Sequence, residues 1–359
     1  MIDRSARLSL AVTSLLPGNG GIARVARLMA RVLADEARHG RLSLRTVGLY
    51  DEEGVGDLGI ALTGARGSRL RFTAAIQASE LRSTHCLSDS LAMVRAHNVL
   101  PLLRRPLLAW IHGIEVWDGA RADRLDAARR TDLLVANSAY TRARAEGLHG
   151  GFARAQVCWL GTEGDDAPAP VQRDGSPIVL VLGRLEPGRD KGHQALIDIW
   201  PQVVGAVPAA RLRIVGGGPD LQRMRELVAR SAASTSIEVT GFIPDDAIAA
   251  VWAQATVFAM PSRGEGFGLV YVEAMRQGVP VIASVHDAAP EINVDGETGY
   301  NVDLGRPADL TDRIVQVLRD RDLAARLGAA GQQRWAQHFR YSAFRQRFLS
   351  VLEHFVSSH

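Results

Sequence analysis

Short apolar runs alternate with longer segments of helical periodicity along the whole chain. In the first half a helix is predicted at 22–38, and strands are predicted at 8–15, 42–49, 70–72, 84–87, 107–112, 133–137 and 157–160. In the second half strands are predicted at 178–183, 212–215, 237–240, 255–260 and 279–284, and helices at 192–204, 221–231, 245–253, 307–327 and 341–355. Strands separated by helices are typical of an α/β fold with parallel sheets.

A segment rich in proline, glycine and acidic residues, 161–177, interrupts this alternation and predicts a linker. The chain of 359 residues suits two domains. We therefore expect a Rossmann-like domain over residues 1–165, a second over 166–340, and a C-terminal helix over 341–359 that can pack back on the first domain. Two such domains form a cleft into which the loops after their strands project.

Composition excludes several classes of protein. No apolar run is long enough to span a bilayer, no signal-peptide pattern opens the chain, and the two cysteines, Cys86 and Cys158, give no disulfide framework. We expect a cytoplasmic protein with reduced thiols. The sequence has no zinc-type cysteine and histidine cluster, no P-loop and no hydrolase nucleophile elbow. The conspicuous Asp-x-Asp, Asp320-Arg-Asp322, falls in a helical segment, so a metal-binding role is not expected.

Charge divides unevenly along the chain. Residues 1–165 hold 22 arginines and 17 acidic residues, within a chain of net charge +3. This balance could favour an anionic surface or acceptor for the first domain, but arginines scattered over solvated helix faces are the better explanation. Lys191 is the only lysine of the chain, and it hints at a site that needs a compact ammonium group.

One stretch of the second half, Pro261-Ser-Arg-Gly-Glu-Gly-Phe-Gly-Leu-Val-Tyr-Val-Glu273, reads as a glycine-rich loop followed by a helix from about Leu269. Glycines let the backbone approach a ligand, and the free N–H groups and dipole of a helix start favour phosphate. Glu265 and Glu273 flank that site. Because ionised carboxylates only accept hydrogen bonds, they predict a ligand rich in hydroxyl groups.

A second loop follows the strand at 178–183 and carries Arg184 and Lys191. Two cations there can grip a diphosphate and stabilise its charge as it leaves. The alternative is an exposed loop that happens to be basic. Gly216-Gly-Gly-Pro219 lacks the spacing of a dinucleotide-binding motif, and Ser284-Val-His286-Asp287 is too local for a catalytic triad and is interpreted as a loop after a strand.

In the first half, Gly20 and Gly21 occupy the turn between the first strand and its helix, as in a doubly wound sheet. His112 lies at the tip of an apolar strand, where a catalytic and a structural role are equally plausible. Glu115 and Trp117 follow it and are candidates for an acceptor sugar site, with core packing as the alternative for the tryptophan.

The chain resembles family 4 of the retaining glycosyltransferases, which have the GT-B fold: two Rossmann-like domains whose parallel sheets face each other across a cleft. The second half matches almost throughout, through Leu182-Gly-Arg184, Lys191-Gly-His193, Val215-Gly-Gly-Gly-Pro219, Thr240-Gly-Phe242-Ile-Pro244, Pro261 to Ala274, Gly278-Val-Pro-Val-Ile and Asp295-Gly-Glu-Thr-Gly299. The first half, the variable acceptor domain, matches only through Gly20-Gly21, His112-Gly113 and Ala136-Asn-Ser138. The stretches 261–273 and 111–117 also resemble the branch that builds bacterial surface polysaccharides.

The resemblance implies a role for each matching residue. Glu273 would accept hydrogen bonds from the donor ribose, Glu265 would meet the transferred sugar, and Arg184 and Lys191 would neutralise the diphosphate. The remaining donor contacts would be the amides of Gly266, Phe267, Gly268 and Leu269, a base wall at Gly216 and Phe242, and Gly20 and Gly21 at the phosphate, with His112 near the sugar. No protein nucleophile is expected. In the mechanism that the resemblance implies, the leaving phosphate helps to deprotonate the acceptor while the sugar departs from the same face, so the anomeric configuration is retained.

We therefore expect a metal-independent transferase that needs no cofactor besides its nucleotide-diphosphate sugar and moves a hexose to a glycan or lipid-linked acceptor. Contact with the inner face of the cell membrane would suit a lipid acceptor, and no nucleic acid partner is expected. Three alternatives stay open: a sugar-nucleotide epimerase or hydrolase, a glycan phosphorylase with Lys191 as its pyridoxal lysine, and a non-catalytic nucleotide-sugar binder.

Overall fold

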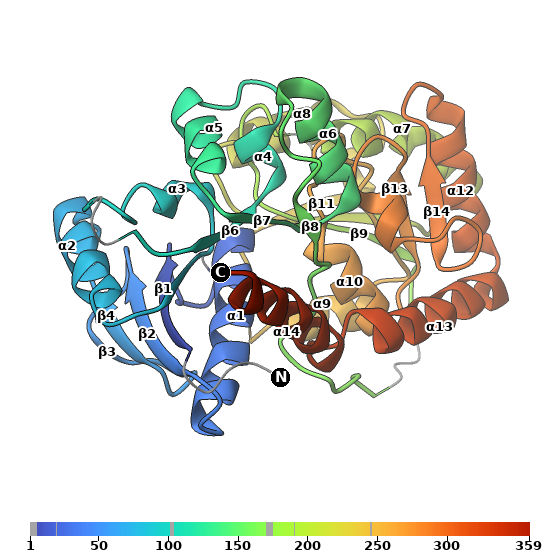
Figure 1. Ribbon diagram of the computed structural model, residues 1–359. Helices are drawn as coiled ribbons and strands as arrows, with labels where there is room; N and C mark the ends of the chain where they lie inside the picture. Colours follow the sequence, from blue (N-terminus) through green and yellow to red (C-terminus); the bar gives the residue numbers. More distant parts are fainter. Residues whose placement is uncertain (1–5, 19, 101–103, 170–174, 190, 245) are drawn as a thin grey trace. The chain divides into compact units, whose positions relative to one another are not determined.

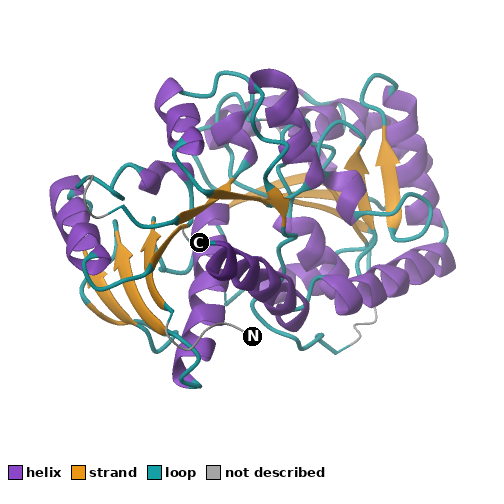
Figure 2. Cartoon of the chain, viewed as in Figure 1, coloured by secondary structure: helices purple, strands orange, loops and turns teal. Residues whose placement is uncertain are grey.

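The computed structural model describes residues 6–18, 20–100, 104–169, 175–189, 191–244 and 246–359. The chain divides into two compact units. Unit 1 comprises Met1–Glu163 and Tyr341–His359, and unit 2 comprises Gly164–Arg340. Each unit is built around its own sheet, whose strands lie between helices (Figure 1, Figure 2).

The sheet of unit 1 has the order β3-β4-β2-β1-β5-β6-β7-β8, and all neighbours are parallel except β3 and β4. Its strands are β1 Arg7–Val12, β2 Ser43–Gly48, β3 Gly54–Val55, β4 Ala61–Gly64, β5 His85–Ser88, β6 Leu107–Ile111, β7 Leu133–Ala136 and β8 Gln156–Val157. Its helices are α1 Gly20–Arg38, α2 Arg69–Glu80, α3 Leu91–Val94, α4 Gly113–Val116, α5 Ala122–Arg129, α6 Ala139–His149 and α14 Tyr341–Ser358. Strands β6 and β7 are buried on both faces, which explains their continuous apolar runs.

The last helix, α14, packs against α1 and the sheet of unit 1 (Figure 1). Phe344 and Phe348 of α14 contact Trp110 of β6, with ring centroids 6.3 and 6.1 Å from the indole. Tyr341 donates a hydrogen bond of 2.6 Å to Asp35 at the end of α1. These buried aromatic contacts fix the C-terminal segment on unit 1, although all residues of unit 2 come between them in the sequence.

The sheet of unit 2 is entirely parallel and has the order β11-β10-β9-β12-β13-β14. Its strands are β9 Ile178–Leu182, β10 Arg211–Val215, β11 Ile237–Gly241, β12 Val257–Ala259, β13 Val281–Ser284 and β14 Gly299–Val302. Its helices are α7 His193–Ala206, α8 Leu221–Arg230, α9 Ile248–Gln254, α10 Leu269–Arg276, α11 Ala289–Ile292, α12 Pro307–Arg319 and α13 Arg321–His338, with a short 3₁₀ turn at Ser234–Ser236. This strand order is that of a doubly wound Rossmann sheet.

Two sequence-based assignments are wrong. Residues 70–72 form no strand and belong to α2, because Ser68 caps the helix by accepting the N–H of Arg71 while Phe72 and Ile76 pack inward at helical spacing. The single helix predicted at 307–327 is two helices. Asp320 separates them, since its carboxylate accepts the N–H of Leu323 at 2.8 Å and starts α13. Asp320 is therefore the cap of α13, and both Asp320 and Asp322 are exposed.

None of the helices in the described part of the chain combines the length and the hydropathy that crossing a membrane requires.

Candidate active site

The strand order of unit 2 reverses between β9 and β12, so the loops that follow these two neighbouring strands diverge. Ligands of open α/β sheets bind outside the carboxyl ends of the strands at such a point. The loop after β9 carries Arg184 and Lys191, and the loop after β12 carries the glycine-rich stretch up to Gly268. The two loops singled out in the sequence thus belong to one edge of one sheet.

Lys191 and Glu265 form an ion pair between these loops, with Nζ 2.9 Å from Oε1. Both side chains are mostly buried, at 27% and 17% exposure, so the pair is shielded from solvent more than a surface ion pair would be. The lysine stem lies over Gly183, where an added Cβ would come within 2.8 Å of Lys191 Cδ. Glycine at 183 therefore leaves the space through which the ammonium reaches the glutamate.

The residue after the lysine holds the two loops in contact. Gly192 has a φ of +90°, and a Cβ there would lie 2.6 Å from the ring and carbonyl of Pro261. Only glycine satisfies both conditions without strain. Helix α7 begins directly afterwards, at His193, whose side chain is buried.

Helix α10 begins at Leu269, as the sequence predicted, with Gly268 as its N-cap at a φ of +85°. A Cβ on Gly268 would lie 2.3 Å from the buried ring of Tyr271, and the hydroxyl of that tyrosine donates to the carbonyl of Met260 at 2.8 Å. The tyrosine thus fixes the end of β12 to the start of α10. The positive end of the α10 dipole lies at the point where the loop ends.

Three other predicted donor residues of this stretch differ in their burial and in their contacts. Phe267 is buried and packs edge-on against Phe339, with centroids 6.1 Å apart, so its ring anchors the loop. Gly266 is partly buried in the loop itself. Glu273 lies in the second turn of α10 and is partly buried.

Arg184 is more exposed than Lys191 and contacts a different partner. Its guanidinium lies 3.2 Å from Glu186 and is 68% exposed, and Glu186 also pairs with Arg189 at 2.9 Å. Lys191 is therefore the cation that the structure joins to the glycine-rich loop, while Arg184 lies at the rim of the same β9 loop.

An exposed aromatic ring stands next to a glycine turn at the end of β10. Gly216 has a φ of +154°, and a Cβ on it would lie 1.8 Å from the carbonyl oxygen of Gly183, so this turn abuts the β9 loop. Gly217 lies close to Phe242, because a Cβ added at residue 217 would lie 3.0 Å from the Cβ of Phe242. The side chain of Phe242 is 74% exposed, which leaves the ring face open for stacking.

A buried carboxylate that the sequence did not single out as functional supports this site. Asp287, in the loop after β13, accepts the N–H of Glu265 at 3.1 Å through Oδ2 and the N–H of Ala289 at 2.9 Å through Oδ1. Burial raises the pKa of Asp287 to about 7, against the lowering effect of these two backbone donors. The only signal in the sequence was the Ser284-Val-His286-Asp287 motif, which was interpreted as a loop.

In unit 1 the strand order reverses between β1 and β5, and candidate residues lie on the loops of that sheet edge. Gly20 and Gly21 open α1 after β1, and added Cβ atoms would meet no neighbour within 4 Å. His112 follows β6 and precedes α4, and its ring is buried. Its Nε2 lies 2.7 Å from the carbonyl oxygen of Asp89, so Nε2 carries the proton. Burial lowers the pKa of His112 to about 4, which keeps the imidazole neutral.

The two candidate acceptor residues have different surroundings. Glu115 is partly buried and accepts the N–H of His112 at 3.3 Å, and burial raises its pKa to about 8. Trp117 is only 7% exposed and belongs to a hydrophobic cluster, where it packs edge-on against Tyr140 with centroids 5.6 Å apart. This location gives the indole a packing function, the alternative considered from sequence, and contact with an acceptor stays a prediction for both residues.

Among the described residues, one group offers metal-ligating atoms close together, Glu80, Cys86 and His97 in unit 1. Its carboxylate is already occupied by hydrogen bonds: His97 Nδ1 lies 2.8 Å from Oε1, Cys86 Sγ 3.6 Å from it, and Gln77 Nε2 2.8 Å from Oε2. Burial holds the pKa of the Cys86 thiol above its ordinary value, so the sulfur keeps its proton. The three side chains form a buried hydrogen-bond network around the Glu80 carboxylate, in which Nε2 of His97 makes no hydrogen bond with any described residue.

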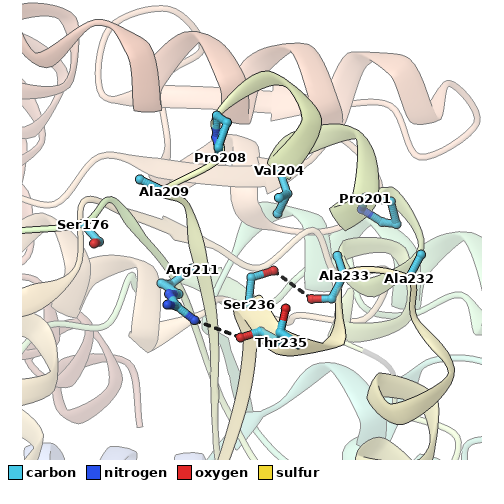
Figure 3. A pocket seen from close by; sticks show the side chains of 10 residues that line it. All are labelled: Ser176, Pro201, Val204, Pro208, Ala209, Arg211, Ala232, Ala233, Thr235 and Ser236. Atoms are coloured by element: carbon cyan, nitrogen blue, oxygen red, sulfur yellow. Dashed lines mark hydrogen bonds between the residues drawn. The ribbon is translucent and has the colours of Figure 1, made fainter.

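Two hollows in the described part of the chain lie away from these loops. One, of about 540 Å³ in unit 2, is lined by Ser176, Pro201, Val204, Pro208, Ala209, Arg211, Ala232, Ala233, Thr235 and Ser236 (Figure 3). Ser176 precedes β9 and Arg211 begins β10. This hollow therefore lies at the amino ends of the two strands, opposite the switch point. The other, of about 600 Å³ in unit 1, is lined by residues of α5, α6 and the turn after α6, among them Arg129, Phe152 and Arg154.

The sequence relates the chain to known proteins. Residues 164–334 match the family model "Glycosyl transferases group 1". The chain is 34% identical, over 68% of its own length and 69% of the relative's, to the GDP-mannose-dependent alpha-(1-6)-phosphatidylinositol monomannoside mannosyltransferase of Mycobacterium tuberculosis. It is 36% identical, over 66% of its length and 68% of the relative's, to the enzyme of that name from Mycolicibacterium smegmatis.

Two solved structures have the same fold. Sucrose-phosphate synthase from Thermosynechococcus elongatus superposes with a TM-score of 0.83 at 20% identity, over 99% of this chain and all of that one. Anabaena HepE, solved with UDP and glucose, superposes with a TM-score of 0.76 at 19% identity, over 97% of this chain and all of that one. The loops at the switch point of unit 2, the family model and the mannosyltransferase relatives agree: this chain is a glycosyltransferase of family 4 with the GT-B fold.

Proposed function

We propose that this enzyme transfers mannose from GDP-mannose to a lipid-linked acceptor, with retention of the anomeric configuration and without a metal ion. The observation that carries the proposal is the Lys191–Glu265 ion pair at the switch point, next to the start of α10. Donor and acceptor class are inferred from the relatives, which are named GDP-mannose-dependent mannosyltransferases of phosphatidylinositol mannosides.

In this proposal Lys191 acts on the leaving group. Its ammonium lies beside the glycine-rich loop, where the positive end of the α10 dipole adds to its field. Both stabilise the charge that grows on the diphosphate as the sugar departs. Arg184, at the rim of the same β9 loop, would close over the outer phosphate by leaving Glu186.

Glu265 and Glu273 divide the hydroxyl groups of the donor between them. Glu265, one residue before the loop amides, would accept hydrogen bonds from the mannosyl hydroxyls, and Glu273, in the second turn of α10, from the ribose. The exposed ring of Phe242 would stack on the guanine.

The transfer step needs no base from the protein in this account. The bond from the sugar C1 to the phosphate oxygen breaks, and the acceptor hydroxyl forms its bond to C1 on the same face. The proton of that hydroxyl passes to the departing phosphate. His112, neutral because of its low pKa and held by the Asp89 carbonyl, would contact the sugar without changing its charge.

An acceptor in a bilayer requires the enzyme to reach the membrane surface. Leu70 in the first turn of α2 is 86% exposed and lies between the exposed Arg69 and Arg71. An apolar side chain between two cations suits an anionic lipid surface. Sedimentation with phosphatidylinositol-containing vesicles should pull down the enzyme at low salt and release it at high salt. A Leu70→Ser and Arg71→Ser variant should stay in the supernatant under both conditions.

The direct test incubates the purified enzyme with radiolabelled GDP-mannose or UDP-glucose and with vesicles of a phosphatidylinositol mannoside, with and without EDTA. We expect labelled lipid with GDP-mannose but not with UDP-glucose. EDTA should not change the rate of transfer, and NMR spectroscopy of the product should show an α-linkage. Free mannose released without an acceptor would indicate a hydrolase. Donor binding without any product would indicate a non-catalytic binder.

A further inference from the structure

Both the N–H and the C=O of Glu265 are held by the loop between β13 and α11. The N–H donates to Asp287 Oδ2 at 3.1 Å, and the carbonyl accepts the N–H of Ala288 at 3.1 Å. The other oxygen of Asp287 accepts the N–H of Ala289 at 2.9 Å, which fixes the carboxylate itself. The backbone of Glu265 is therefore clamped on both sides, and Asp287 supplies the side-chain half of the clamp.

A second contact joins the same two loops closer to the sheet. The hydroxyl of Ser284 donates to the carbonyl of Ser262, and the hydroxyl of Ser262 accepts the N–H of Gly264 at 3.0 Å. Ser284 also accepts the N–H of His286 at 3.1 Å. The glycine-rich loop is thus supported along its first half by the β13 loop, although glycines at 264, 266 and 268 would otherwise leave its backbone free.

We propose that Asp287 is a positioning residue for sugar transfer, which sets the orientation of Glu265 and, through Glu265, that of Lys191. Its side chain is 3% exposed, so it does not reach a ligand itself. Asp287 acts through the backbone of Glu265, whose carboxylate lies 2.9 Å from the ammonium of Lys191. This inference rests on the proposed function, since it assigns Asp287 to the step in which Glu265 meets the sugar.

The clamp depends on the charge of Asp287. As an ionised carboxylate it accepts both backbone N–H groups, one at each oxygen, whereas a proton on either oxygen weakens one of the two bonds. The titratable groups that face it are Glu265 from the β12 loop and Tyr271 from α10, and Lys191 acts through Glu265. The neighbouring His286 turns to Asp303 instead, at 3.1 Å. Acid should therefore loosen the loop near neutral pH, where the pKa of Asp287, about 7, lies.

The test compares Asp287→Asn with Asp295→Asn, whose carboxylate also accepts a backbone N–H, that of Asn301 at 2.8 Å, but in a neighbouring loop. An asparagine can accept only one of the two N–H groups. We expect Asp287→Asn to lower kcat at least about tenfold, to leave the affinity for GDP alone unchanged, and to remove the acid limb of the kcat profile. Asp295→Asn should match the wild type in all three measurements.

Three outcomes would overturn the inference. The first is an Asp287→Asn variant with the same kcat and pH profile as the wild type, and the second is a loss of GDP affinity in that variant as large as its loss of kcat. The third is that the kcat of the wild-type enzyme itself shows no acid limb. The last measurement needs no variant and decides the case if Asp287→Asn does not fold. Glu265→Gln, assayed in parallel, separates this inference from the proposed function. If Glu265→Gln loses transfer while Asp287→Asn keeps it, only the positioning role fails, and if neither wild type nor variant transfers sugar, the proposed function fails.

Discussion

The ammonium of Lys191 lies 2.9 Å from the carboxylate of Glu265, and the two residues come from loops that follow neighbouring strands. In the proposed reaction, Lys191 would supply the cation for the departing phosphate and Glu265 the acceptor for the sugar hydroxyls. Because the two opposite charges offset each other in a mostly buried position, removing one partner leaves the other charge uncompensated. The effects of single substitutions at 191 and 265 should therefore not be additive.

Glu273 should control donor affinity more than the rate of transfer. Glu273→Gln removes the charge of a carboxylate proposed to accept hydrogen bonds from the ribose, so we expect the Kd for GDP to rise about tenfold to a hundredfold. Isothermal titration calorimetry with GDP measures this directly. Glu297→Gln, on an exposed turn of the same unit, serves as the control and should bind GDP as the wild type does. An unchanged Kd for Glu273→Gln would remove the ribose assignment.

Gly268→Ala should destabilise unit 2 more than its backbone conformation alone explains. The φ of +85° costs about 1–2 kcal/mol for alanine, and the added Cβ would lie 2.3 Å from the buried Tyr271 ring. We expect a total loss of at least about 2 kcal/mol in the free energy of unfolding, measured in urea. Gly188→Ala isolates the backbone contribution, because Gly188 has a similar φ of +73° and open space around it. Equal losses in the two variants would show that the tyrosine can move aside.

Glu115 should make unit 1 less stable as the pH rises. Its pKa in the folded chain, about 8, lies above that of an unfolded glutamate, so its contribution is fully present below pH 4.5 and is lost as the pH rises to about 8. Glu115→Gln removes this dependence. We expect the free energy of unfolding of Glu115→Gln to exceed that of the wild type. The difference should grow from pH 4.5 to pH 8 and reach between about 1 and 4 kcal/mol.

Chemical denaturation of both proteins at pH 5, 6, 7, 8 and 9 measures that difference. Glu53→Gln, at an exposed position of the same unit, should run parallel to the wild type. A constant difference between Glu115→Gln and the wild type across the pH series would contradict the assignment of a neutral carboxylic acid to Glu115.

Much of unit 2 could be predicted from the sequence because its local signals agree with its packing. Apolar runs, glycine turns and helix starts coincide there, and the family resemblance is confirmed by the relatives. Helix α10 begins at the predicted residue because glycine at 268 is required by both the left-handed turn and the tyrosine ring. The role of each donor residue, by contrast, is still a prediction.

Contacts between loops distant in sequence could not be predicted. Nothing in the composition of Ser284-Val-His286-Asp287 indicates that Asp287 accepts the N–H of a residue 22 positions earlier. The burial of Trp117 and the neutral state of His112 also depend on tertiary packing, and a short apolar pair at 70–72 was too brief to separate a strand from the helix that Ser68 caps.

The most direct test of the central claim is the rate of single-turnover mannosyl transfer from radiolabelled GDP-mannose by Lys191→Ala. Loss of the cation beside the departing diphosphate should lower this rate about a hundredfold or more. Arg189→Ala removes an exposed cation from the same β9 loop and should keep the wild-type rate, because Arg189 pairs with Glu186 rather than with Glu265. A Lys191→Ala rate within about threefold of the wild type would contradict the assignment of Lys191 to the leaving group.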